Sequence, residues 1–299
     1  MQPRNTIVRI PELPPEILKA LTPSDDIAIN SAHQSVQRLN MLAAKLPSNY
    51  HWRFRTLEAF ASEQEQMKRT ARNVLPFNQL YWEDMLKNCE AYSMMSTWRV
   101  VELARSCVWA LARHDLVCSA LMARSALETT VQYVDFARTI SATLERLPEV
   151  DVRWNLIISD DLEKYLLKTV FASRREGDDE YYKPTNIVTI INRIAKIDGH
   201  AMIGSHYETL CEVAHPNFLG RSLHIVEIRP GSRSGDEIRI LAPSQVDLDL
   251  SVTRGTVGAL SWACATQVTA FALMSTTIHD FLKRFRKLGI RVARHTPGP

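Results

Sequence analysis

The sequence predicts an all-α protein, a bundle of long helices with a β-hairpin inserted near residues 222–241. Long segments carry apolar residues at helical spacing, which is the pattern of helices that bury one face. Gly is scarce, at 10 of 299 residues, and the 14 prolines cluster between the periodic segments. A content of 45% hydrophobic and 23% charged residues is typical of a globular chain with a sizeable core.

We expect three parts in the chain. Residues 1–22 are Pro-rich and predict an extended N-terminal arm, residues 23–288 predict a single helical domain, and residues 289–299 predict a basic, flexible tail. Caps, apolar periodicity and proline stops set the expected helix boundaries. The predicted helices cover 23–46, 50–73, 79–113, 116–147, 160–173, 184–197, 205–214 and 248–288.

The break between the two longest early helices is predicted at His114-Asp115, with Asp115 as the N-cap of the second helix. That helix, 116–147, is apolar on most of its circumference through Val134. An apolar circumference is typical of a helix that other helices surround. We therefore expect it to be the central helix of the bundle.

The hairpin prediction depends on two short segments, Ser222–Ile228 and Glu237–Leu241, on either side of a stretch rich in Gly, Pro and Ser. Two strands alone are marginally stable in water. We therefore expect the hairpin to pack on the helices. Later in the chain, Gly255 and Gly258 fall within a helical pattern and are interpreted as packing positions.

Composition limits the function classes. A net charge of +3 is too small for nucleic-acid binding by bulk electrostatics. Five widely spaced cysteines without a Cys-x-x-Cys pair predict free thiols in a reducing cytoplasm. The most apolar stretch, 257–274, contains polar residues and predicts a buried helix rather than a membrane span.

Basic residues concentrate near the C-terminus. They predict either a solvated helix end, where cations favour the helix dipole, or a segment that binds RNA or a nucleotide through phosphates. The residues are Lys283, Arg284, Arg286, Lys287, Arg291 and Arg294.

Arg124 and Glu128 lie four residues apart on the predicted central helix and therefore share a face. A charged pair on a buried helix is costly unless it is paired and hydrogen-bonded. One interpretation is an internal ion pair that fixes helix packing. The other is a polar pocket that binds a ligand or performs acid–base chemistry.

A second polar cluster runs from Tyr207 to Asn217. Tyr207, Cys211 and His215 are spaced by four and fall on one side of a helix. His215, before Pro216, is interpreted either as a capping histidine or as a group that transfers protons. Tyr207, Asn217 and Arg221 are the candidate binding residues, and His215, Arg124 and Glu128 are the candidate catalytic residues.

No cofactor or metal site is predicted. Glu212 and His215 form one Glu-x-x-His pair, whereas a di-metal bundle needs two such pairs and further carboxylates. The chain also has no Gly-x-Ser-x-Gly, no Gly-Lys-Ser/Thr loop and no Gly-x-Gly-x-x-Gly.

Two motifs carry a resemblance. Ala-x-x-x-Arg-Ser-x-x-Glu, at 120–128, precedes Tyr-x-x-Leu-x-x-x-x-His-Pro-Asn, at 207–217. Together they resemble an uncharacterised group of bacterial helical proteins over roughly 98–223. The architecture is also similar to the HEPN (higher eukaryote and prokaryote nucleotide-binding) bundles, many of which are ribonucleases of toxin or defence systems. The Arg-and-His motif of that family is matched within a helix here by Arg193 and His200.

Three functions are consistent with these observations. The first is a cytoplasmic binding or regulatory module without catalysis, for which the resemblance implies a link to a bacterial stress or defence system. The second is a metal-independent ribonuclease or toxin, in which Arg124 would hold a phosphate or carboxylate and His215 would act as general acid or base. The third is a helical homodimer whose polar pair specifies assembly.

Overall fold

The fold is known from a computed structural model. It describes residues 9–21, 26–52, 55–171, 183–215, 217–233, 235–242 and 250–287. The predicted tail at 289–299, with Arg291 and Arg294, lies outside these residues.

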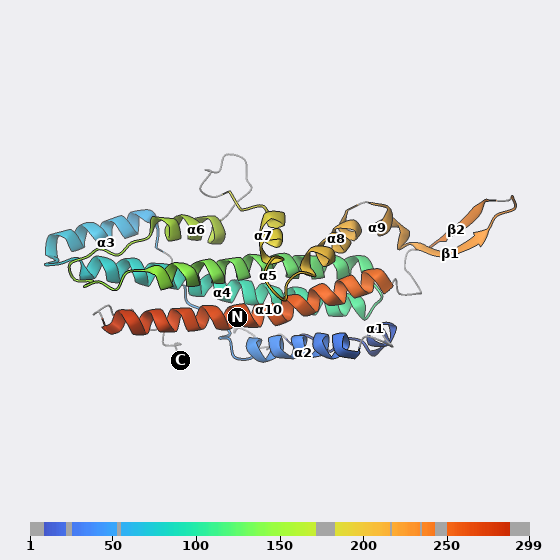
Figure 1. Cartoon of the computed structure of the whole chain (residues 1–299), viewed down its shortest axis with the longest axis horizontal. Coiled ribbons are helices and arrows are strands. Elements are labelled where there is room, and N and C mark those ends of the chain that lie inside the picture. Colours follow the sequence, from blue (N-terminus) through green and yellow to red (C-terminus); the bar gives the residue numbers. More distant parts are fainter. Residues whose placement is uncertain are drawn as a thin grey trace, which may run out of the picture. The chain divides into compact units, whose positions relative to one another are not determined.

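The described residues form ten α-helices and one two-stranded antiparallel sheet, so the predicted fold class is confirmed (Figure 1). The elements, in chain order, are α1 Pro15–Ala20, α2 Asp26–Ala43, α3 Leu57–Thr70, α4 Leu75–Leu111, α5 Leu116–Arg146, α6 Asp160–Val170, α7 Ile187–Ile194, α8 Ile203–Ala214, α9 Phe218–Ser222, β1 Ile225–Pro230, β2 Glu237–Leu241 and α10 Leu250–Lys287.

The chain divides into two compact units. Unit 1 comprises Met1–Leu46, Ser96–Val134 and Ile187–Val268. Unit 2 comprises the remainder, Pro47–Met95, Asp135–Asn186 and Thr269–Pro299. The long helices α4, α5 and α10 each contribute residues to both units. The single domain expected over 23–288 stays a prediction.

The N-terminal segment differs from the extended arm expected over 1–22, because α1 forms within it. Pro15 is the first helical residue, where a missing N–H costs no hydrogen bond. Ile10 and Ile17 are buried, and the Asn40 side chain exchanges two hydrogen bonds, of 2.8 and 2.9 Å, with the Ile10 backbone. Core burial and these bonds therefore fix the segment on α2.

The helix predicted over 50–73 starts later, after Thr56, whose hydroxyl caps the N-terminus of α3. Before this cap, the Tyr50 hydroxyl and the Trp52 indole donate hydrogen bonds of 2.7 and 3.0 Å to side chains of α4. These bonds hold the segment in a non-helical conformation, which residue patterning alone does not indicate.

The predicted break at His114-Asp115 is confirmed. His114 has a φ of 58°, a left-handed conformation that stops α4. The Asp115 carboxylate accepts a 3.0 Å hydrogen bond from the backbone N–H of Cys118, as an N-cap does. The turn thus ends one long helix and starts the next within four residues.

In unit 1, α8 packs closely on α10 at two glycines. A Cβ atom at Gly255 would lie 3.0 Å from Cγ2 of Thr209, and one at Gly258 would lie 2.6 Å from Cε1 of His206. The predicted role of both glycines in packing is therefore confirmed. Burial lowers the pKa of His206, because the charged imidazolium is disfavoured at this contact.

The core of unit 2 centres on α4. Trp82 is fully buried, and its ring contacts those of Phe281 and Phe285 at centroid distances of 4.8 and 6.0 Å. One turn before it, the fully buried Asn78 amide makes three 2.8 Å hydrogen bonds to the backbone of residues 152–157. This side chain fixes the connection between α5 and α6.

The helix α10 is long and apolar enough over Ser251–Lys287 to cross a membrane by length and composition alone, the one such helix among the described residues. Helices buried in a protein core meet the same criteria of length and composition. Within unit 1 some of its polar side chains bond protein groups: Trp262 donates to His200 at 2.9 Å, and Gln267 donates to Thr97 at 2.9 Å.

The hairpin forms as predicted but does not pack on the helices as expected. Most residues of both strands are exposed, and the strands extend away from α8 and α9 (Figure 1). The first strand also starts later than predicted, at Ile225, because residues 218–222 form α9. Contacts that join the hairpin to the residues before it are the 2.9 Å hydrogen bond from the Ala242 N–H to the His224 carbonyl and the Arg239 guanidinium over the Phe218 ring.

Candidate functional site

The predicted pair on α5 forms. Nε of Arg124 donates a 2.9 Å hydrogen bond to Oε1 of Glu128. The two side chains retain 24% and 30% of their exposure, so the pair is partly open to solvent. This corrects the expectation that other helices surround α5, since the helix leaves a stripe uncovered that also includes Leu121.

Tyr207 of α8 completes the cluster around Arg124. Nη2 of Arg124 donates to the Tyr207 hydroxyl at 3.4 Å, and the guanidinium carbon lies 5.4 Å from the centroid of the Tyr207 ring. Both contacts favour the cation, the second through the electron-rich ring face. The two motifs of the sequence, 83 residues apart, therefore meet in unit 1.

The protonation states in this cluster follow from its contacts. Burial raises the pKa of Tyr207 to about 12, with a hydrogen bond to Cys211 in the same direction and one from Arg124 against it. Burial by itself lowers the pKa of Arg124, but the bond to Tyr207 and the charge of Glu128 outweigh it and the pKa is raised. At neutral pH Arg124 is thus a guanidinium cation and Tyr207 a neutral phenol.

His215 lies apart from this cluster. It is exposed and follows the last residue of α8, and its backbone N–H donates to the Cys211 carbonyl at 2.9 Å. Eight residues separate it from Tyr207, which is about 12 Å along a helix axis. Within the described part of the chain, its imidazole makes no hydrogen bond or ion pair with Arg124 or Glu128.

The remaining predicted residues, Asn217 and Arg221, bond locally. The Asn217 amide donates a 3.1 Å hydrogen bond to Glu212, and Nε of Arg221 donates to the Asn217 carbonyl at 3.4 Å. Both bonds are exposed, and the first ties the N-cap residue of α9 to the end of α8. Neither residue shares a hydrogen bond with Arg124 among the described residues.

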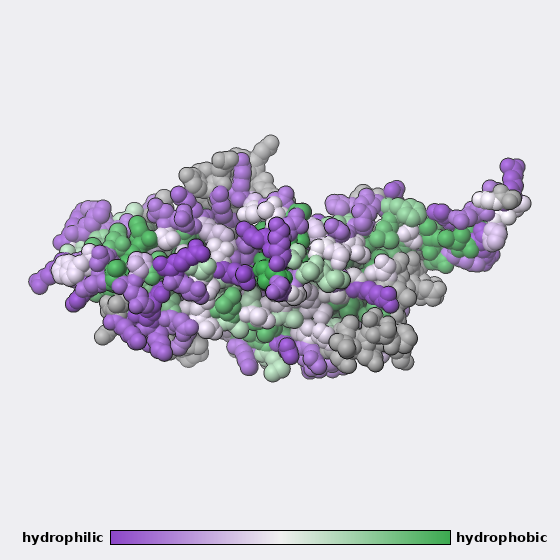
Figure 2. All heavy atoms as spheres, viewed as in Figure 1, coloured by the Kyte–Doolittle hydropathy of each residue, from purple (hydrophilic) through white to green (hydrophobic). Residues whose placement is uncertain are grey.

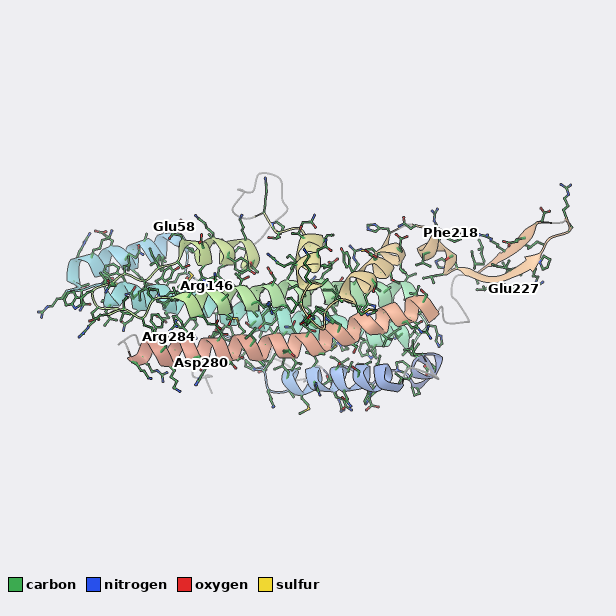
Figure 3. All side chains as sticks on the ribbon, in the orientation of Figure 1. Glu58, Arg146, Phe218, Glu227, Asp280 and Arg284 are labelled. Atoms are coloured by element: carbon green, nitrogen blue, oxygen red, sulfur yellow. The ribbon has the colours of Figure 1, made fainter. Side chains whose placement is uncertain are left out.

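The basic end of α10 borders hollows in unit 2, among them one of about 290 Å³ lined by Glu149, Asp280, Lys283, Arg284 and Lys287. Another, of about 220 Å³, is lined by His279, Leu282, Lys283, Arg286 and Lys287. A further one, of about 230 Å³, includes Asp280 and Arg284, which lie one turn apart on α10 (Figure 3). Arg284 donates to the Leu144 carbonyl near the C-terminus of α5, so it has a capping role.

No group of three or more His, Cys, Asp or Glu is placed to hold a metal ion within the residues that the structure describes.

Spacing alone indicated that Arg124 pairs with Glu128. The contact that spacing did not predict is the one between Arg124 and Tyr207, although each residue was a candidate by itself.

Comparisons with protein-family models, with curated proteins and with solved structures gave no match. The resemblance to HEPN bundles and to a bacterial helical family therefore stays a prediction.

Proposed function

We propose that this chain is a non-catalytic binding module, which recognises a carboxylate or phosphate group of its ligand through Arg124. One observation supports the proposal above the others. The guanidinium is held in a fixed orientation by Glu128 and Tyr207 while a quarter of the side chain remains exposed. An arginine ordered in this way loses little conformational entropy when a ligand binds.

The N–H groups of Arg124 that make no bond to described residues support an anionic ligand. A guanidinium has five N–H donors in a planar fork, and contacts with described residues use two of them. The remaining donors match the two oxygens of a carboxylate or phosphate. Glu128 offsets the charge of Arg124, so geometry rather than net charge is expected to provide specificity.

The position of His215 favours binding over catalysis. A general base must reach the proton it abstracts directly or through one water. The exposed imidazole is about two helical turns from the residue that contacts Arg124. A substrate group held by Arg124 would therefore lie outside hydrogen-bond reach of His215.

The test uses thermal unfolding of the full chain with inorganic phosphate, succinate or AMP. We expect at least one probe to raise the melting temperature of the wild type, since a ligand at a hundred times its Kd adds about 2.7 kcal/mol of stability. Arg124→Met should abolish the shift. The control Arg113→Met, which removes an exposed arginine at the end of α4, should retain it.

Two outcomes would overturn the proposal. One is an absence of any shift in the wild type, or an equal shift in Arg124→Met. The other is RNA cleavage by the wild type that His215→Ala abolishes, which would establish the ribonuclease instead.

A further inference from the structure

The hairpin presents two exposed strand edges. The sheet contains only β1 and β2 in the described part of the chain, so one edge of each strand has unpaired backbone groups. Ile228, Ile238 and Leu241 are 57%, 53% and 69% exposed. Hydrophobic side chains gather where α9 leads into the hairpin (Figure 2), and Phe218 of α9 is also exposed (Figure 3). Such edges and patches mark sites where other chains bind.

Both strands contain the same three residues, Glu-Ile-Arg, at 227–229 and 237–239. Within the hairpin these triplets are out of register, because Ile228 lies opposite Arg239 and Arg229 lies opposite Ile238. The charges therefore lack partners across the pair of strands. Instead, each arginine bonds the glutamate two residues earlier in its own strand, Arg229 at 2.8 Å and Arg239 at 3.2 Å.

A Glu-Ile-Arg triplet is complementary to itself when two copies run antiparallel. The isoleucines then lie opposite each other, and each glutamate lies opposite an arginine. Opposite charges placed directly across two strands attract each other, whereas like charges in the same positions are destabilising. A twofold axis repeats every contact, so one triplet supplies two ion pairs.

We infer that β2 pairs with β2 of a second copy of this chain, around a twofold axis at Ile238. Glu237 then lies opposite the partner's Arg239, and Arg239 lies opposite the partner's Glu237. The two hairpins form one four-stranded antiparallel sheet, in the strand order β1, β2, partner β2, partner β1. This arrangement pairs the backbone groups at the exposed edge of β2.

The outer edge of β1 is less suited to this role. Pro230 has no backbone N–H to donate, and the register shift between Ile225 and Glu227 disrupts regular pairing. Proteins use both features to block edge strands from adding further strands. The described residues of β2 contain neither a proline nor a register shift.

The expected association is weak and depends on concentration. A strand of five residues buries less surface than the interfaces of stable dimers. Sedimentation velocity of the full chain from micromolar to several hundred micromolar should therefore show a monomer–dimer equilibrium.

Charge reversal tests the register. Glu237→Lys places cations on both sides of the twofold axis, and Arg239→Glu places anions there, so each variant alone should associate at least about tenfold more weakly. An equimolar mixture of the two should recover association, because unlike charges then face each other. The matched variants Glu227→Lys and Arg229→Glu on β1 should associate as the wild type does.

Circular dichroism and melting temperature check that each variant folds. A monomer throughout the concentration range would overturn the inference, as would a dimer that neither β2 variant weakens. A mixture that stays monomeric would exclude the proposed register. Sensitivity to the β1 variants in place of the β2 variants would place the contact on the other edge.

Discussion

Asn78 in unit 2 and Arg124 in unit 1 are both polar side chains on long helices, but they differ in burial and in hydrogen bonding. Asn78 is fully buried, and its amide makes three bonds of 2.8 Å. Arg124 is 24% exposed, and its two bonds measure 2.9 and 3.4 Å. A buried amide must find partners within the protein, whereas a partly exposed guanidinium can exchange water for a ligand.

The contrast distinguishes a structural polar group from a candidate for recognition. Asn78 bonds backbone groups, which lose these partners if the side chain is removed. Arg124 bonds two side chains, and the Glu128 side chain is 30% exposed, so it can exchange this bond for water. Burial of the bonded groups, rather than their charge, therefore decides which of the two should control stability.

The largest expected effect is that of Asn78→Ala. It leaves a buried N–H and two carbonyls without partners, so we expect a loss of about 3–5 kcal/mol in the free energy of unfolding. Urea denaturation followed by circular dichroism measures the loss. Asn155→Ala removes an exposed amide from the same segment and should cost less than about 1 kcal/mol. Similar losses in the two variants would contradict the structural role of Asn78.

The next effect concerns α8, which positions Tyr207 over Arg124. In Gly258→Ala the new methyl group would lie 2.6 Å from the His206 ring, and such overpacking costs about 1–3 kcal/mol. Gly204→Ala provides the control, because a Cβ atom there meets nothing within 4 Å. An alanine in an open helical position adds about 0.5–1 kcal/mol of stability. The two alanine variants should therefore shift the urea midpoint in opposite directions, and a shared direction would argue against close packing of α8 on α10.

The sequence predicts best those features that depend on local spacing. The long helices α4, α5 and α10 follow from apolar periodicity, and the turn at His114-Asp115 follows from a polar cap between apolar runs. In the same way, a separation of four residues indicates that Arg124 pairs with Glu128. Each of these predictions needs only residues that are close in the chain.

The features that the sequence does not predict depend on distant residues. The N-terminal segment that contains α1 is fixed by burial of Ile17 and by the bonds of Asn40 to the Ile10 backbone, and α3 starts late because Tyr50 and Trp52 bond α4. The contact of Arg124 with Tyr207 joins residues 83 positions apart. A hairpin that packs on helices and one that projects have the same alternation of residues, so its exposure was also not predicted.

The smallest expected effect is the coupling of Arg124 with Glu128. In a double-mutant cycle of Arg124→Met, Glu128→Gln and the double variant, we expect a coupling energy of about 0.3–1 kcal/mol in urea unfolding, because solvent weakens an exposed pair. A coupling of about 3 kcal/mol or more would mean that the pair behaves as a buried structural element, like Asn78. In that case the free donors of Arg124 would be part of helix packing, and the contrast between the two clusters would no longer identify a binding site.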